Sequence, residues 1–177
     1  MRIENKLCEH VKNMQGFILG IGIQSDSILE QIHKTESIKN CVLLGTETGG
    51  KGTSSSEIVN IRDFRKKWKR KRIDYIMADS KEILPYLKYF IKDSIYINKR
   101  KIYIFLYKKE EQREIIEIIT KRYKRYSVKM ETEKCKDGYI IEIENTDYKH
   151  HFLKDKFYYV IDTIGEWIDH MSDVLNG

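Results

Sequence analysis

Two kinds of apolar spacing alternate along this chain, and together they predict alternating strands and helices. Short, nearly continuous apolar runs are typical of buried strands and lie at 16–23, 41–44, 57–61, 72–79 and 101–107. Apolar residues three or four positions apart are typical of amphipathic helices and lie at 4–14, 26–35, 83–91 and 110–123. Two β-rich runs separated by a turn predict a hairpin at 126–135 and 139–144.

This order of elements predicts the class of fold. Strand–helix alternation favours a parallel sheet with helices on both faces, and a final hairpin adds an antiparallel edge that such sheets tolerate. We therefore expect an α/β protein: a three-layer Rossmann-like sandwich around a mostly parallel seven-stranded sheet with an antiparallel C-terminal hairpin. One domain is expected at 1–145.

A helical extension is predicted at 146–177. Apolar residues recur there at three- and four-residue steps: Phe157, Val160, Ile161, Ile164, Ile168, Met171 and Leu175. An apolar stripe of this size is unfavourable in water. We therefore expect the helix either to pack across the sheet domain or to pair with the same helix of a second copy in a homodimer.

Composition indicates a globular protein of the cytoplasm. Charged residues make up 34% of the 177 residues and hydrophobic residues 41%, and no apolar run reaches the roughly 18 residues of a membrane span. The first residues are not followed by the apolar segment of a secretory signal. The three widely spaced cysteines, Cys8, Cys41 and Cys135, suit reduced thiols, and we expect no metal site.

The first predicted strand ends in a glycine-containing turn that opens a helix. Gly20 and Gly22 lie at its end, and the polar residues Gln24, Ser25 and Asp26 precede the helical pattern. Glycine lets a ligand approach the backbone closely, and the first N–H groups of a helix face such a ligand. Ser25 or Asp26 can cap those N–H groups. The turn therefore predicts a site for a nucleotide-like ligand.

This turn, with the strands and the terminal hairpin around it, resembles the class I S-adenosylmethionine-dependent methyltransferases over residues 4–145. In that family an acid precedes a Gly-x-Gly-x-Gly turn by two residues. Here Ile18 stands at the acid position and Gln24 at the third glycine. The resemblance implies S-adenosylmethionine as cofactor, with binding residues at the turn: Gly20, Gly22, Gln24, Ser25 and Asp26. A non-catalytic binding protein with the same fold and a decayed cofactor site is the alternative.

The resemblance also implies roles for three acids. Glu47, after the second strand, would hold the ribose hydroxyls, because a carboxylate accepts two hydrogen bonds from a vicinal diol. Asp63 would contact the adenine amino group. Asp79 ends a strand at the edge that faces the substrate, where it would be the catalytic residue that orients or deprotonates the acceptor. Its alternative role is to cap the helix that begins at Ser80.

A second motif predicts a different ligand. Residues 45–53 fit Gly-x4-Gly-Lys-Gly-Thr and resemble the phosphate loop of adenylate-kinase-like enzymes, which wraps phosphates in backbone N–H groups. Such a loop must open a helix, whereas the sequence after Thr53 favours a strand. A phosphate-loop nucleotide-binding protein is therefore the second alternative.

Positive charge is concentrated in one segment. Residues 62–72 contain eight basic residues and one acid, a net charge of +7, while the whole chain carries +6. Bases interleaved with aromatic residues favour nucleic acid, because cations bind phosphates and rings stack on bases. We expect RNA or another anionic partner to bind Arg65, Lys66, Lys67, Trp68, Lys69 and Arg70. The family resemblance thus implies a methyltransferase whose acceptor is unidentified, and the basic segment makes RNA the expected class of acceptor.

Overall fold

The computed structural model describes residues 1–44, 73–122 and 128–146, and in the C-terminal segment 157, 159–165, 167, 168 and 171. Its centre is a six-stranded mixed sheet in the order β2-β1-β3-β4-β6-β5. The strands are β1 (Gly16–Ile21), β2 (Ile38–Leu44), β3 (Ile73–Asp79), β4 (Asn98–Leu106), β5 (Val128–Cys135) and β6 (Gly138–Asn145). The first four are parallel, and β6 and β5 add the antiparallel edge. The predicted fold class is confirmed, while the strand expected at 57–61 lies outside the described residues.

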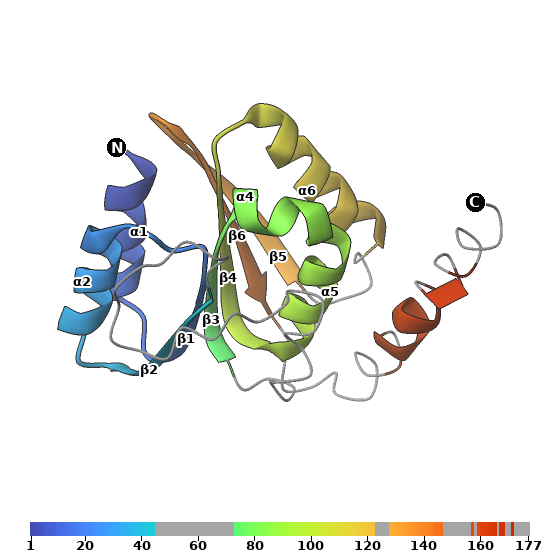
Figure 1. Ribbon diagram of the computed structural model, residues 1–177, viewed down its shortest axis with the longest axis horizontal. Coiled ribbons are helices and arrows are strands. Elements are labelled where there is room, and N and C mark those ends of the chain that lie inside the picture. The colour runs from blue at the N-terminus through green and yellow to red at the C-terminus, as the bar shows by residue number, and fades with distance from the viewer. Residues whose placement is uncertain are drawn as a thin grey trace.

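Helices cover both faces of the sheet and complete three layers (Figure 1). On one face lie α1 (Ile3–Lys12) and α2 (Asp26–Lys34). On the other lie α4 (Ser80–Ile83), the 3-10 turn η2 (Leu84–Tyr86), α5 (Leu87–Ile97) and α6 (Lys109–Arg122). The amphipathic helices thus bury their apolar stripes against the sheet, as their spacing predicts.

The central strands are apolar on both sides because both faces of the sheet are covered. In β1, Ile18 packs with α1 and α2, whereas its neighbour Leu19 packs with α5 and α6. The same division separates Met77 from Ile76 in β3. Side chains alternate across a strand, so strands buried on both faces have continuous apolar runs.

The helical region after β3 is more interrupted than its apolar spacing predicts. Apolar spacing predicts one helical region at 83–91, but α4 ends at Ile83 and a 3-10 turn containing Pro85 precedes α5. Proline lacks a backbone N–H, so Pro85 cannot donate a hydrogen bond within the helix, although Leu84 before it keeps the α conformation. The short α4 begins directly at the end of β3, and the break separates it from α5.

Among the described residues of the C-terminal segment, Tyr159 and Thr163 contact α5 of the sheet domain. Tyr159 is buried, its hydroxyl donates a hydrogen bond to Asp93 of α5 over 2.8 Å, and its ring lies 4.2 Å from that of Tyr96. Lys92 Nζ also lies 3.4 Å from Thr163 Oγ1. The described side chains of the apolar stripe predicted for this helix are exposed instead: Phe157, Val160, Ile161, Ile164, Ile168 and Met171. Leu175, the last residue of the predicted stripe, lies outside the described residues. Helix 159–165 therefore contacts α5 with its polar and aromatic side, and its apolar stripe faces away from that contact.

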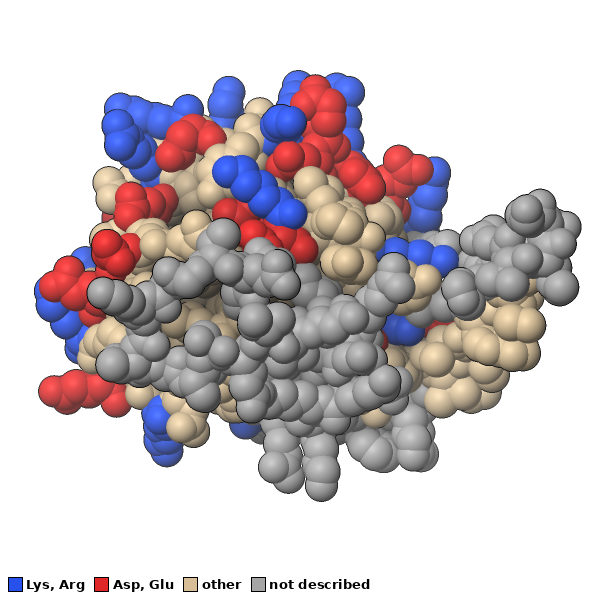
Figure 2. Space-filling model, viewed as in Figure 1, with Lys and Arg blue, Asp and Glu red and all other residues tan. Residues whose placement is uncertain are grey.

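The surface of the described residues carries charges of both signs. On the face shown in Figure 2, acidic and basic side chains are interspersed over the helices. Several form ion pairs, such as Lys6 with Glu133 at 2.9 Å and Lys101 with Glu142 at 2.5 Å. In the part of the chain that the structure describes, no helix is long and apolar enough to cross a membrane.

Candidate active site

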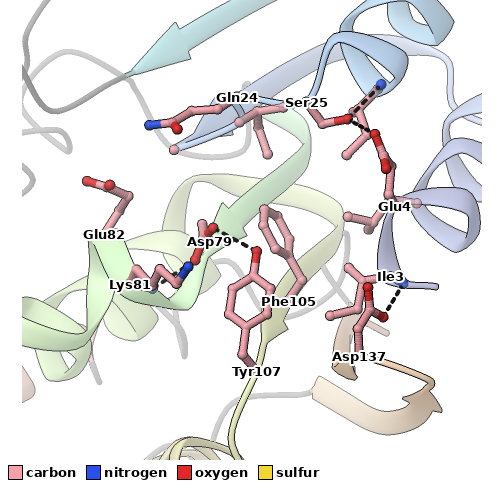
Figure 3. A pocket seen from close by; sticks show the side chains of 14 residues that line it. Ile3, Glu4, Gln24, Ser25, Asp79, Lys81, Glu82, Phe105, Tyr107 and Asp137 are labelled. Carbon is pink, nitrogen blue, oxygen red and sulfur yellow. Dashed lines mark hydrogen bonds between the residues drawn. The ribbon is translucent and has the colours of Figure 1, made fainter. Parts of the chain in front are cut away.

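A cavity of about 340 Å³ opens where the parallel strands β1, β3 and β4 end. The pairing register of the strands brings these ends together, since Ile21 of β1 pairs with Ala78 of β3 and Asp79 of β3 pairs with Phe105 of β4. Figure 3 shows Glu4 and Ser25 on one side of the cavity and Asp79, with the residues that follow it, on the other. Ligands of open α/β sheets bind at this edge, because loops and helix starts diverge there.

Gly22 lies directly after β1, lines the cavity and has a conformation that favours glycine. Its φ is +69°, and a Cβ built there would lie 2.4 Å from Cγ of Glu82 and 3.2 Å from Cβ of Asp79. Gly20, by contrast, lies within β1, and its Cβ would meet the side chain of Leu43 at 2.7 Å. Only Gly22 of the two lines the cavity, so Gly20 is a packing position beneath the turn.

The start of α2 is capped by Ser25. Its Oγ accepts a hydrogen bond from the N–H of Ile28, and Gln24 and Ser25 both line the cavity. Asp26 is the first residue of α2 and does not line the cavity. Of the two predicted caps, the structure thus uses Ser25, whose hydroxyl accepts from an N–H group that the helix leaves free.

Glu4 of α1 reaches this turn from a distant part of the sequence. Its Oε1 accepts hydrogen bonds from the hydroxyls of Ser25 and Ser27, and these bonds lower the pKa of Glu4. Its Oε2 accepts no hydrogen bond from the described residues. The cavity wall therefore holds an ionised carboxylate with one oxygen available.

The β5–β6 turn holds α1 in the position that presents Glu4. Asp137 Oδ1 accepts a hydrogen bond from the N–H of Ile3 over 2.8 Å, and the N–H of Lys136 donates to the carbonyl of Met1 over 2.9 Å. An acceptor at the first turn of a helix satisfies an N–H group without an intrahelical partner. The hairpin thus contributes to the site by anchoring the first turn of α1.

Asp79 lies opposite Glu4, and both of its oxygens accept hydrogen bonds. Oδ1 accepts from the N–H of Lys81 over 2.9 Å, so Asp79 caps α4, and Oδ2 accepts from the hydroxyl of Tyr107 over 3.1 Å. Burial raises the pKa of Asp79, although these two bonds act in the opposite direction. Burial and the nearby carboxylate raise the pKa of Tyr107 to about 12, so this phenol remains a donor at neutral pH.

Several predicted site residues lie outside the described residues. They are Glu47, Asp63, the phosphate-loop-like segment 45–53 and the basic residues Arg65, Lys66, Lys67, Trp68, Lys69 and Arg70. Ile18, at the family's acid position, is fully buried in the core on the side of α1 and α2. In the part of the chain that the structure describes, no three His, Cys, Asp or Glu side chains are grouped to hold a metal ion.

Sequence reasoning missed Glu4 and Tyr107. Glu4 has a detectable signal, because it lies three positions before Leu7 and seven before Val11 and so shares the buried face of α1. Tyr107 directly follows β4, beside the end of β3 that was already predicted to carry a functional acid. Both residues are brought to the cavity by tertiary contacts.

Comparison with solved structures shows which fold this is. M. capricolum TrmK, solved with the natural cofactor product S-adenosyl-homocysteine, matches with a TM-score of 0.54 and 16% identity over 98% of this chain and 85% of its own. Precorrin-6y C5,15-methyltransferase from Geobacter metallireducens matches with a TM-score of 0.56 and 9% identity over 80% and 86% of the two chains. The fold is that of S-adenosylmethionine-dependent methyltransferases.

The methyltransferase fold is shared with little sequence similarity. The human methyltransferase 10 domain containing protein matches with a TM-score of 0.52 and 12% identity over 82% of this chain and 83% of its own. No family model and no curated protein matches the sequence. The match to M. capricolum TrmK extends beyond residue 145, since it covers 98% of this chain.

Proposed function

We propose that this protein binds S-adenosylmethionine in the cavity at the ends of β1, β3 and β4 and transfers its methyl group to an acceptor, with RNA as the expected class. The observation that carries the proposal is the pairing of a positive-φ glycine turn with two carboxylates, Glu4 and Asp79, across one cavity of a methyltransferase fold. Fold alone does not determine activity, so the site residues must account for the chemistry.

The residues of the cavity fit the cofactor in charge and shape. S-adenosylmethionine carries a positive sulfonium and a positive ammonium group, and β1 (Gly16–Ile21) itself contributes no acid. Glu4, ionised and with one oxygen available, would hold the ammonium group by a charge-assisted hydrogen bond. Gly22 has no side chain to obstruct the turn, and Gln24 supplies polar atoms at its edge.

Asp79 is suited to hold a proton released by the acceptor. The bound cofactor would supply an electrophilic methyl group, and the attacking nitrogen or oxygen of the acceptor must lose a proton. Burial raises the pKa of Asp79, which makes this carboxylate a stronger base than an exposed aspartate. The donors at Lys81 and Tyr107 hold its two oxygens in a fixed direction.

RNA is proposed as the acceptor class because of the charge of segment 62–72. Its net charge of +7 exceeds that of the whole chain, while the described surface carries both signs. A basic segment of this kind binds the phosphate backbone of a nucleic acid with little dependence on its sequence.

Calorimetry and a methyl-transfer assay test the proposal together. S-adenosylmethionine and S-adenosylhomocysteine should each bind the wild-type chain at one site, and ATP should not. Radiolabelled methyl groups should then enter RNA and not a protein mixture of the same concentration. ATP binding without binding of either methionine derivative would contradict the proposal and favour the phosphate-loop alternative.

A binding protein without activity is a second candidate. It is favoured by Ile18, which places a fully buried apolar side chain where active family members have an acid. Binding of S-adenosylhomocysteine without methyl incorporation into RNA, DNA or protein would support this candidate and contradict the catalytic role of Asp79.

A further inference from the structure

We propose that this protein forms a homodimer through the apolar stripe of its C-terminal helix. The stripe consists of the exposed side chains Phe157, Val160, Ile161, Ile164, Trp167, Ile168 and Met171, which are 39% to 63% exposed. The partner that covers the stripe is the same helix of a second copy of the chain, related to the first by a twofold axis.

The stripe repeats with a period of seven residues. Phe157, Ile164 and Met171 form one column on the helix, Val160 and Trp167 a second, and Ile161 and Ile168 a third. A period of seven keeps an apolar seam facing a partner helix along its whole length. A twofold axis presents the same seam from both chains, so one contact covers both stripes.

The exposed area is close to what a stable interface requires. Side chains of these sizes and exposures present roughly 650 Å² of apolar surface, against about 800 Å² for each partner of a standard interface and at most about 600 Å² for the largest patch of a typical monomer. The stripe exceeds what a monomer usually leaves in water, and the flanks of the helix would complete the remainder.

The charge of the helix argues against RNA or an anionic membrane as the partner that covers the stripe. The sequence from 157 to 177 contains four acidic residues and no Lys or Arg. RNA phosphates and anionic lipid headgroups would both be repelled by such a helix. In the part of the chain that the structure describes, the helix contacts α5 through Tyr159 and Thr163, and the side chains of the stripe stay exposed.

The same acidic residues give the dimer a distinctive salt dependence. Two copies of a helix with net negative charge repel each other, and salt screens that repulsion while strengthening apolar association. The dimer should therefore become tighter as the salt concentration rises, whereas RNA binding should weaken.

Sedimentation of the full chain tests the proposal with a matched pair of variants. Ile164→Glu adds a charge within the stripe, and Gly165→Glu adds the same charge one residue later, where a new Cβ meets nothing within 4 Å. From about 1 to 100 µM, the dissociation constant of the Gly165→Glu dimer should stay within about threefold of the wild-type value, because an exposed charge outside the seam adds little repulsion. Ile164→Glu should raise the dissociation constant at least tenfold. Circular dichroism verifies that all three chains fold.

Four results would overturn the proposal. They are a monomeric wild type at about 100 µM, equal dimerisation of Ile164→Glu and the wild type, equal loss in both variants, and a dimer that weakens as salt rises. A monomeric wild type that binds phosphatidylglycerol vesicles or an RNA oligonucleotide, with loss of that binding in Ile164→Glu, would assign the stripe to that partner instead.

Discussion

The hydroxyl of Tyr107 donates a hydrogen bond to Asp79 Oδ2 over 3.1 Å and so joins the end of β3 to the residue after β4. A donor to the charged form of a carboxylate stabilises that form and lowers its pKa. Burial acts in the opposite direction and is the larger effect at Asp79. The basicity of Asp79 is thus set by a balance between burial and two donors.

Tyr107→Phe should raise the pKa of Asp79 further. The variant removes one of the donors that lower this pKa and leaves the burial of the carboxyl group. Carbon-13 NMR titration of the Asp79 carboxyl group measures this pKa directly. The acidic limb of the pH–rate profile of methyl transfer should move to higher pH by the same amount, because Asp79 must be ionised to accept a proton. Tyr89→Phe, on α5, is the control and should leave the titration of Asp79 unchanged. An unchanged or lower pKa in Tyr107→Phe would refute this role of the hydroxyl.

Glu4→Gln should weaken the binding of S-adenosylhomocysteine about tenfold, because the substitution removes the negative charge from the hydrogen bond that Glu4 would make to the ammonium group of the ligand. The affinity for 5′-methylthioadenosine, which lacks the amino-acid end, should stay the same. Glu9→Gln makes the same change on an exposed position of α1 and should affect neither ligand. Equal weakening of both ligands by Glu4→Gln would show that the variant disturbs the cavity as a whole.

Gly22→Ala should destabilise the fold by about 1–3 kcal/mol. Its φ of +69° disfavours any side chain, and the new Cβ would lie 2.4 Å from Glu82 Cγ. Gly165→Ala is the matched control, since its Cβ meets nothing within 4 Å, and it should be neutral or stabilising. Urea denaturation at constant pH measures both, and equal unfolding free energies for the two variants would contradict the strain argument.

Removal of charge from segment 62–72 should flatten the salt dependence of RNA binding. We expect the combined substitution of Lys66, Lys67, Lys69 and Arg70 by Gln to reduce the slope by up to about 0.7 per lost phosphate contact. A control variant replaces four exposed lysines of the described surface by Gln: Lys12, Lys39, Lys108 and Lys109. If the salt dependence of RNA binding changed equally in both variants, the net charge of the protein would explain the effect, and segment 62–72 would have no special role.

Much of the fold could be predicted because its signals are local. The central strands are buried on both faces and therefore appear as continuous apolar runs, and the helices bury single stripes. The break at Pro85 and the first residues of β4, such as Lys99 and Arg100, were not predicted, because polar strand ends and short 3-10 turns have no apolar period.

The candidate site was predictable only in part. Gly22, Gln24 and Ser25 follow the end of β1 and Asp79 ends β3, and sheet topology gathers such positions at one edge. The spacing of Glu4 places it on the buried face of α1 but does not place it at the cavity, because the hydrogen bond from Ile3 to Asp137 that anchors this helix joins distant parts of the sequence. The stripe of the C-terminal helix was predicted, but its exposure depends on Tyr159, which lies off the stripe.

NMR mapping of S-adenosylhomocysteine on the isotope-labelled wild-type chain tests the location of the cofactor site most directly. The largest amide shifts should fall on Gly22, Gln24, Ser25 and Lys81, with smaller shifts at the first turn of α1. A second cavity, between His10 and Glu142, provides the internal comparison and should not respond. Shifts confined to that second cavity, or no shifts at millimolar ligand, would contradict the proposed site.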